Sequence, residues 1–257
     1  MFAPYHRRGA ISQAIGDRPA PEHASGLADR QRHSSPGGRT GMNKVFGLGL
    51  NKTGTTTLGD CLAALGYRQC PYIPIYERRW ERVEPQVWRR IEEYDSFVDW
   101  PYPLMFREIY RRYPDAKYIL SLRRSPEKWL KSLKQHALQT RWWDSPLQWD
   151  QSDYLAYGQY FPFGNDDKYL DFYRRHTREV REFFQDKPGQ LLELCWEHQH
   201  GWQELCRFLD KPVPAMQIPH ANASASRGIT ARRVWRNKIF CSVLQPYAAR
   251  EVLGFQL

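Results

Sequence analysis

The segment best suited to chemistry is a short polar loop at residues 51–57. It reads Asn51-Lys52-Thr53-Gly54-Thr55-Thr56-Thr57. An apolar run of strand length, residues 44–50, precedes it, and apolar residues at helical spacing follow it. A tight loop between a strand and a helix directs several backbone N–H groups and the positive end of the helix at one point, which suits a phosphate group. The sequence therefore predicts a phosphate site at residues 49–56.

The lysine of this loop is not where an ATP-binding loop has it. Gly49 and Gly54 reproduce the G-x4-G frame of a Walker loop and Thr56 its hydroxyl position, but Thr55 stands where the Walker lysine belongs. The lysine is Lys52, inside the loop, instead of at the position that serves a β/γ-phosphate pair. This placement removes the usual case for magnesium and ATP. The alternative is a Gly- and Thr-rich turn that only caps the following helix.

A second candidate anion site follows the apolar run at residues 117–122. The chain continues as Arg123-Arg124-Ser125-Pro126, and Ser132 lies eight residues beyond Arg124. Lys128 and Ser132 share one helix face by their i, i+4 spacing, while Trp129 and Leu133 form the neighbouring apolar stripe. Arg124 and Ser132 can therefore face a ligand while the helix packs. The alternative is an ordinary capped helix with a solvated basic start.

Together the two segments resemble the sulfotransferase family. That family has a loop of Lys, a small residue, Gly, Thr and Thr, followed later by Arg-x-Pro and a helical Ser at the spacing found here. The resemblance implies 3′-phosphoadenosine 5′-phosphosulfate as the donor and no metal. It implies that Lys52 is catalytic and stabilises charge, that residues 51–57 hold the 5′-phosphate, and that Arg124 and Ser132 hold the 3′-phosphate.

The resemblance also bears on the adenine and on the extent of the domain. Many family members place an aromatic residue at the position of Thr57 to stack on adenine, so the purine must find another surface here. Trp196 follows the last predicted strand, where relatives place an aromatic residue near adenine, and Arg227-Gly228 resembles a basic loop that closes on the 3′-phosphate. The likeness spans roughly residues 43 to 222.

Transfer to a hydroxyl needs a base near the acceptor, in line with the departing phosphate oxygen. Asp99 is the candidate, since it ends a predicted strand at the sheet edge of the loop, and Asp99-Trp100-Pro101 is similar to the His-x-Pro that carries the base in cytosolic relatives. An aspartate, with an ordinary pKa of roughly 3.9, is a weak base at neutral pH unless burial raises that value. The alternative is a strand-end aspartate bonded to a turn or to Lys52.

The elements that position these residues alternate between strands and helices, which predicts a parallel α/β sheet. Strands are predicted at residues 44–50, 67–70, 96–99, 117–122 and 190–195. The first helix is expected to be capped by Thr55 or Thr56 and to end at Gly66, and Ser125 and Pro126 open another. Two further helices carry the apolar residues Tyr169, Tyr173, His176, Val180 and Phe184, and Trp202, Leu205, Cys206 and Leu209. With the resemblance, the fold expected is a P-loop NTPase-like three-layer α/β fold with a central parallel sheet of about five strands.

The first 41 residues differ in amino-acid composition from the rest of the chain. They are rich in Arg, Ala, Gly, Pro and Ser and include Ser34-Ser35-Pro36-Gly37-Gly38, which predicts a disordered extension. An organelle transit peptide is the alternative, against which Asp17, Glu22 and Asp29 count. One domain is expected at residues 42–257, and the extension is expected to be dispensable for its stability.

The overall composition fits a cytoplasmic protein. The 257 residues with 41% hydrophobic content can bury one full core. The 5 cysteines show no metal-type spacing and are interpreted as reduced core thiols. No apolar run approaches the roughly 18 residues of a spanning helix, and the N-terminus lacks the apolar core of a secretory signal.

Several readings of function stay open. The expected activity is transfer of a sulfuryl group to a hydroxyl or amine of a small-molecule or glycan acceptor, with neither nucleic acid nor membrane as partner. A P-loop nucleotide kinase or NTPase and a nucleic-acid-binding protein that uses the net charge of +10 are the rivals. A donor-binding relative without activity is a third.

Two groups of side chains remain. The aromatic residues of the stretch 142–163 suit an acceptor pocket or lid, or equally a satellite core under a long loop. They are Trp142, Trp143, Trp149, Tyr154, Tyr157, Tyr160, Phe161 and Phe163.

His198 and His200 lie two apart, which on a helix directs them to different faces and argues against a metal pair, and His176 and His220 are interpreted as structural.

Overall fold

The computed structural model describes residues 43–72, 75, 79–139, 152–159, 161–198, 200–219 and 230–248. The predicted extension lies outside the described residues. So do some of the side chains singled out above, namely Trp142, Trp143, Trp149, Tyr160, His220, Arg227 and Gly228.

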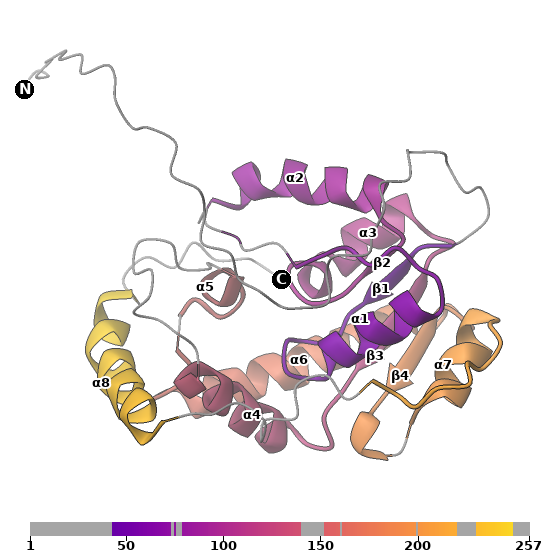
Figure 1. Cartoon of the computed structure of the whole chain (residues 1–257). Coiled ribbons are helices and arrows are strands. Elements are labelled where there is room, and N and C mark those ends of the chain that lie inside the picture. The colour runs from indigo at the N-terminus through magenta and orange to yellow at the C-terminus, as the bar shows by residue number, and fades with distance from the viewer. Residues whose placement is uncertain are drawn as a thin grey trace, which may run out of the picture. The chain divides into compact units, whose positions relative to one another are not determined.

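Four short parallel strands form one sheet in the order β2-β1-β3-β4 (Figure 1). They are β1 (Val45–Gly47), β2 (Ser96–Phe97), β3 (Lys117–Ser121) and β4 (Leu191–Leu194). The predicted α/β class and parallel sheet are confirmed. The fifth predicted strand, at residues 67–70, contributes one isolated parallel bridge, between Gln69 and Ser96, so the expected count of about five strands is close.

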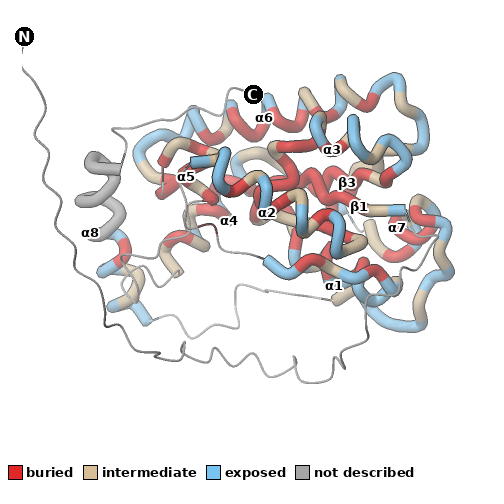
Figure 2. Tube along the Cα trace, turned by 90° about the horizontal axis from the view of Figure 1, so that it is seen from above, coloured by how far each residue is buried: buried red, intermediate tan, exposed pale blue. Residues whose placement is uncertain are grey.

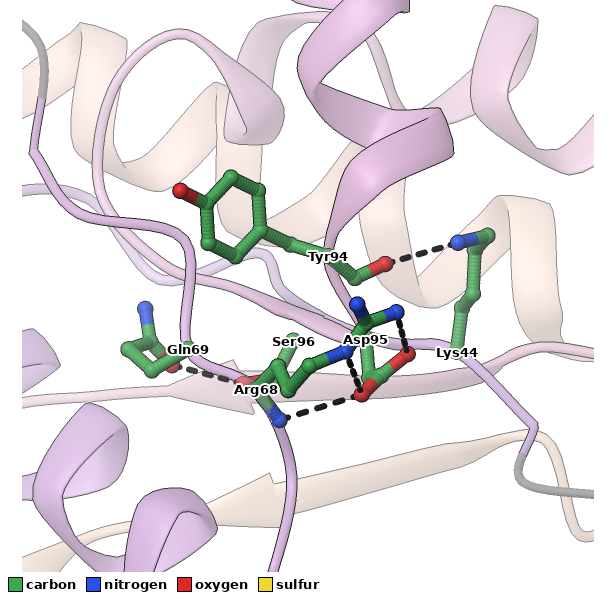
Figure 3. Close-up of polar contacts among 6 residues, drawn as sticks. All are labelled: Lys44, Arg68, Gln69, Tyr94, Asp95 and Ser96. Carbon is green, nitrogen blue, oxygen red and sulfur yellow. Dashed lines mark hydrogen bonds and ion pairs between the residues drawn. The ribbon is translucent and has the colours of Figure 1, made fainter. Parts of the chain in front are cut away.

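Polar contacts hold this fifth segment at the amino end of β2 (Figure 3). The Asp95 carboxylate accepts a bond from the backbone N–H of Arg68 at 3.1 Å and two from its guanidinium at 3.0 and 3.2 Å. The Ser96 hydroxyl donates to the Gln69 amide oxygen at 2.7 Å. These contacts lie at the edge of the sheet opposite to residues 49–57, which are called the phosphate loop below. They therefore stabilise the fold without entering the candidate site.

α-Helices and two short 3₁₀ helices (η) connect the described strands and flank the sheet. They are α1 (Thr55–Ala64), α2 (Trp80–Glu93), η1 (Tyr102–Leu104), α3 (Phe106–Arg112), α4 (Pro126–Gln139), α5 (Ser152–Tyr157), α6 (Asp166–Phe184), η2 (Trp196–His198), α7 (Trp202–Leu209) and α8 (Ala231–Ala248). The predicted helices at α1, α4, α6 and α7 are all present. The structure adds α2, α3, α5 and α8 to these, and α8 packs against α4.

Apolar side chains on both faces of the sheet create the three layers. Successive residues of a strand point to opposite faces. Phe46 and Tyr118 join one buried cluster with side chains of α2, α3 and α6, while Val45 and Ile119 join another with side chains of α1 and α7. Both strands are coloured mainly as buried in Figure 2, and every residue of β1 and β3 except Lys117 is buried. This two-sided burial is the reason that the strands read as continuous apolar runs.

The helix ends confirm most of the capping signals. The Ser125 hydroxyl accepts the N–H of Lys128 at 3.2 Å, and Pro126 is the first residue of α4, as predicted. Gly66 follows α1 with a φ of +90°, which confirms the predicted stop. The predicted Thr55 or Thr56 cap of α1 is wrong: Gly54 is the N-cap, with a φ of 92°, and Thr55 is already helical. Glycine takes this place because a left-handed residue is needed there.

Two further observations concern the whole fold. Cys61, Cys70, Cys195 and Cys206 are buried thiols, as interpreted from the sequence, and burial raises the pKa of Cys61 to about 12. Within the ranges that the structure describes, no helix is both long enough and apolar enough to cross a membrane.

Candidate active site

The site residues predicted from the sequence follow the carboxyl ends of the strands. The phosphate loop follows β1, Asp99 follows β2, Arg124 follows β3 and Trp196 follows β4. Because the strands are parallel, these four ends lie at one edge of the sheet. Ligands of open α/β sheets bind outside this edge.

The phosphate loop is packed tightly against the end of β3. A Cβ atom on Gly49 would collide with Ser121 and would lie 2.6 Å from the Thr53 hydroxyl, so only glycine fits. The Thr53 hydroxyl lies 2.6 Å from the carbonyl of Leu50, to which it donates, and 2.7 Å from the Ser121 hydroxyl. Thr53 is only 1% exposed. In this structure its hydroxyl therefore stabilises the loop.

Asn51 ties the loop to two helices. Its amide oxygen accepts a bond from the Tyr157 hydroxyl at 2.8 Å, and its amide nitrogen donates to Asp153 at 3.0 Å. Its backbone carbonyl accepts from the indole N–H of Trp129 at 2.9 Å. Asn51 was predicted to contact the donor, and in this structure its side chain is hydrogen-bonded to residues of α5.

Lys52 has the left-handed backbone conformation, with a φ of 66°. Its ammonium nitrogen lies 3.5 Å from Nδ1 of His136 on α4. The sequence reading did not single out His136. The spacing of Trp129, Ser132 and His136, at i, i+3 and i+7, places all three on one helix face and is the signal that could have found it.

Asp99 lies beside the start of α1. Its carboxylate accepts a bond from the Thr55 hydroxyl at 3.1 Å and one from the backbone N–H of Trp100 at 3.0 Å. Asp99 also has a left-handed backbone, with a φ of 68°, and is half-buried. The carboxylate is thus fixed next to the first helical residue. Of the other loop residues, Thr56 is exposed and Thr57 half-buried.

A second carboxylate, Asp153 on α5, was missed by the sequence reading. The same oxygen that accepts from Asn51 also accepts the indole N–H of Trp100 at 3.3 Å. Burial raises the pKa of the nearby Tyr157 well above its usual value, and the charges of Asp153, Tyr169 and Asp99 raise it further. Nothing in the local sequence marks Asp153, because it is placed by the packing of α5.

The aromatic stretch contributes to the core beneath the loop. Tyr154, Tyr157 and Phe161 are buried, and Tyr157 packs with Trp129 and other apolar side chains. For these residues the satellite-core reading holds.

At the second candidate anion site, Arg124 and its neighbour Arg123 lie beside Glu197. The backbone N–H of Arg124 donates to the Glu197 carboxylate, and its guanidinium donates to the Glu197 carbonyl, both at 2.8 Å. The Arg123 guanidinium lies 3.2 Å from the same carboxylate. Arg124 is exposed, and Ser132 is half-buried on α4. Glu197 is a further residue of this candidate site to which the sequence analysis gave no role.

Trp196 lies directly against the phosphate loop. A Cβ atom on Gly54 would lie 2.5 Å from its indole nitrogen, so glycine is needed at this contact as well as for its backbone. The indole N–H is buried without a hydrogen-bond partner in the described part of the chain.

Two histidines outside this site have structural partners, and for His176 such a role was expected. His176 is buried, its Nε2 lies 2.8 Å from the carbonyl of Leu48, and burial lowers its pKa to about 4. His200 accepts the backbone N–H of Cys195 at 3.1 Å. The described residues hold no cluster of side chains that could bind a metal ion.

Comparison with known proteins identifies the family of the chain. A protein from Aspergillus versicolor, named Ava biosynthesis cluster protein M, is 28% identical over 235 residues, which cover 76% of this chain and 88% of that protein. The family described as "Sulfotransferase domain" matches residues 44–227, which include the loop and the second candidate anion site. The chain therefore belongs to the sulfotransferase domain family and is a transferase enzyme.

Proposed function

We propose that this enzyme moves a sulfuryl group from 3′-phosphoadenosine 5′-phosphosulfate to a hydroxyl or amine of a small molecule. The observation that carries the proposal is the placement of Lys52 and Arg124 after the neighbouring parallel strands β1 and β3. Two cationic residues at one sheet edge suit a nucleotide with phosphate groups at both its 5′ and 3′ positions.

The hydrogen-bond donors of the loop fit the 5′ end of such a nucleotide. The amino terminus of α1 directs N–H groups toward its end, and Gly54 lets the backbone turn sharply there. Thr55 and Thr56 are at the first turn of α1. We assign the 5′-phosphate to these groups and to Lys52, and the 3′-phosphate to Arg124 and Ser132.

The chemistry follows from the residues at the loop. The bound donor supplies a sulfuryl group on a phosphate leaving group. Lys52 stabilises the negative charge that develops on the departing oxygen, which is where a fixed positive charge lowers a barrier most. Asp99, whose carboxylate is oriented by Thr55 and the N–H of Trp100, accepts the proton from the acceptor. No step in this proposal needs a metal.

The sulfuryl acceptor and the cellular compartment are further parts of the proposal. The Aspergillus versicolor relative is named for a biosynthesis cluster, which favours a small-molecule acceptor over a glycan. The four buried thiols fit a reducing compartment, and we place the activity in the cytoplasm. Neither nucleic acid nor a membrane takes part.

Calorimetry and a transfer assay test the proposal together. We expect 3′-phosphoadenosine 5′-phosphate to bind, and ATP with magnesium to bind at least about tenfold more weakly. With donor labelled in its sulfuryl group, label should move to an acceptor from a panel of phenols, alcohols and amines. Magnesium-dependent binding of ATP without binding of the 3′-phosphorylated nucleotide would support the kinase or NTPase reading instead.

A further inference from the structure

The consecutive residues Trp196 and Glu197 contact both candidate phosphate sites. They form the short turn η2 directly after β4, and β4 is the strand beside β3. The indole of Trp196 lies against Gly54 of the phosphate loop. Glu197 contacts the two arginines that follow β3. One turn of chain therefore connects the loop to the second anion site.

Glu197 makes three separate contacts with the arginines. One oxygen of its carboxylate accepts the backbone N–H of Arg124, and the other pairs with the Arg123 guanidinium. Its backbone carbonyl accepts an N–H of the Arg124 guanidinium. The first contact uses the Glu197 side chain and fixes the backbone of Arg124. The third uses the Glu197 backbone, so it holds one N–H of the Arg124 guanidinium, which has five donors in a rigid fork, whatever the side chain at position 197.

We propose that Glu197 is a positioning residue that sets Arg124 for the 3′-phosphate of the donor. The inference rests on the proposed function and adds a residue to it. A guanidinium that is oriented before the ligand arrives loses less conformational freedom on binding, which favours affinity.

Arg123 compensates the negative charge of the Glu197 carboxylate. A carboxylate close to Arg124 would repel an incoming phosphate if its charge were not compensated. The Arg123 guanidinium pairs with Glu197 where the Glu197 side chain is only 25% exposed. The backbone N–H of Arg123 donates to the Tyr173 hydroxyl at 3.1 Å, which holds this residue in place.

The test compares two nucleotides that differ only at the 3′ position. Affinities for 3′-phosphoadenosine 5′-phosphate and for 5′-AMP are measured by calorimetry for the unaltered chain, Glu197→Ala and Glu197→Gln. We expect Glu197→Ala to weaken binding of the 3′-phosphorylated nucleotide about tenfold and that of 5′-AMP by no more than about twofold. Glu197→Gln keeps an oxygen for the Arg124 N–H and should lose less. Glu193→Gln, which removes the exposed ion pair between Glu193 on β4 and Arg181 on α6, is the matched control.

A double-mutant cycle tests the role of Arg123. Arg123→Gln should weaken binding of the 3′-phosphorylated nucleotide, and the loss should be smaller in the Glu197→Gln background, where no carboxylate remains to be compensated. Equal losses for both nucleotides in Glu197→Ala, or additive effects in the cycle, would overturn the inference and leave the proposed function standing. If the unaltered chain binds neither nucleotide, the proposed function fails and the inference fails with it.

Discussion

The ammonium nitrogen of Lys52 lies 3.5 Å from Nδ1 of His136, although 84 positions separate the two residues in the sequence. An ammonium group can only donate, so Nδ1 accepts when the imidazole is neutral with its proton on Nε2. The helix that carries His136 also donates the Trp129 indole N–H to the carbonyl of Asn51. Both the backbone and the lysine of the phosphate loop are therefore held by α4.

Replacing His136, whose Nδ1 accepts a hydrogen bond from Lys52, should slow sulfuryl transfer. We expect His136→Leu to lower kcat about tenfold, which corresponds to about 1.4 kcal/mol in the barrier, with little change in the KM for the donor. His136→Gln offers an amide oxygen to Lys52 and should restore most of the rate. Initial rates over a range of donor concentrations measure both quantities. Gln135→Leu, at the exposed neighbouring position, is the control, and an equal effect of all three substitutions would contradict the role of the contact.

Lys52 itself should matter more for the reaction than for binding. The charge it compensates grows as the bond from sulfur to the phosphate oxygen breaks, so Lys52→Ala should lower kcat by roughly 10²- to 10³-fold. Affinity for 3′-phosphoadenosine 5′-phosphate should fall far less, because the loop N–H groups and Arg124 remain. Single-turnover rates and calorimetry separate the two effects. Lys131→Ala removes an exposed lysine of α4 as the control, and equal losses of rate and affinity in Lys52→Ala would argue against a catalytic lysine.

The local part of this site could be read from the sequence, and the distant part could not. Strand, loop and helix follow one another within a few residues around Lys52, so the order of residue types already encodes the phosphate loop. The same holds for β3, Arg124 and the Ser125 cap. Asp153 and His136 reach the site through the packing of α5 and α4, and no local pattern records that packing.

A similar limit explains the wrong helix cap. Threonine is a good capping residue in general, which favoured Thr55 or Thr56. The structure uses Gly54 because the loop needs a left-handed residue there and because Trp196, far along the chain, leaves no room for a Cβ atom. A propensity describes one residue, whereas this choice depends on a contact between Trp196 of η2 and the loop.

The two requirements at Gly54 can be separated by comparison with Gly66. Both residues have a positive φ, of 92° and 90°, but a Cβ atom on Gly66 would meet nothing within 4 Å. Gly66→Ala should therefore cost only the backbone strain, about 1 kcal/mol, whereas Gly54→Ala should cost about 2 to 4 kcal/mol in the free energy of unfolding. Urea unfolding measures both values.

Gly54→Ala should also weaken nucleotide binding, since Trp196 or the loop must move, while Gly66→Ala should leave affinity unchanged. If the two alanine variants lose the same stability and bind nucleotide equally well, the contact with Trp196 has no energetic importance.

His176 should make the fold sensitive to mild acid. Burial lowers its pKa from 6.5 to about 4, so the unfolded chain binds its proton more readily than the folded chain does. Stability is therefore lost as the pH falls from about 6.5 to about 4, by at most about 3 kcal/mol from this group. Its Nε2–H donates to the carbonyl of Leu48, just before the phosphate loop, and protonation forces the ring to hold a charge in the core.

The free energy of unfolding in urea at several pH values between 4 and 7.5 measures this dependence. His176→Gln can still donate to Leu48 but cannot titrate, so we expect it to be less stable than the unaltered chain at pH 7.5 by about 1 to 2 kcal/mol, with the gap closing or reversing near pH 4.5. His198→Gln, at an exposed position of η2, should follow the unaltered chain throughout. Parallel curves for His176→Gln and the unaltered chain would show that acid acts elsewhere, because only a group that titrates differently in the two states can change the slope.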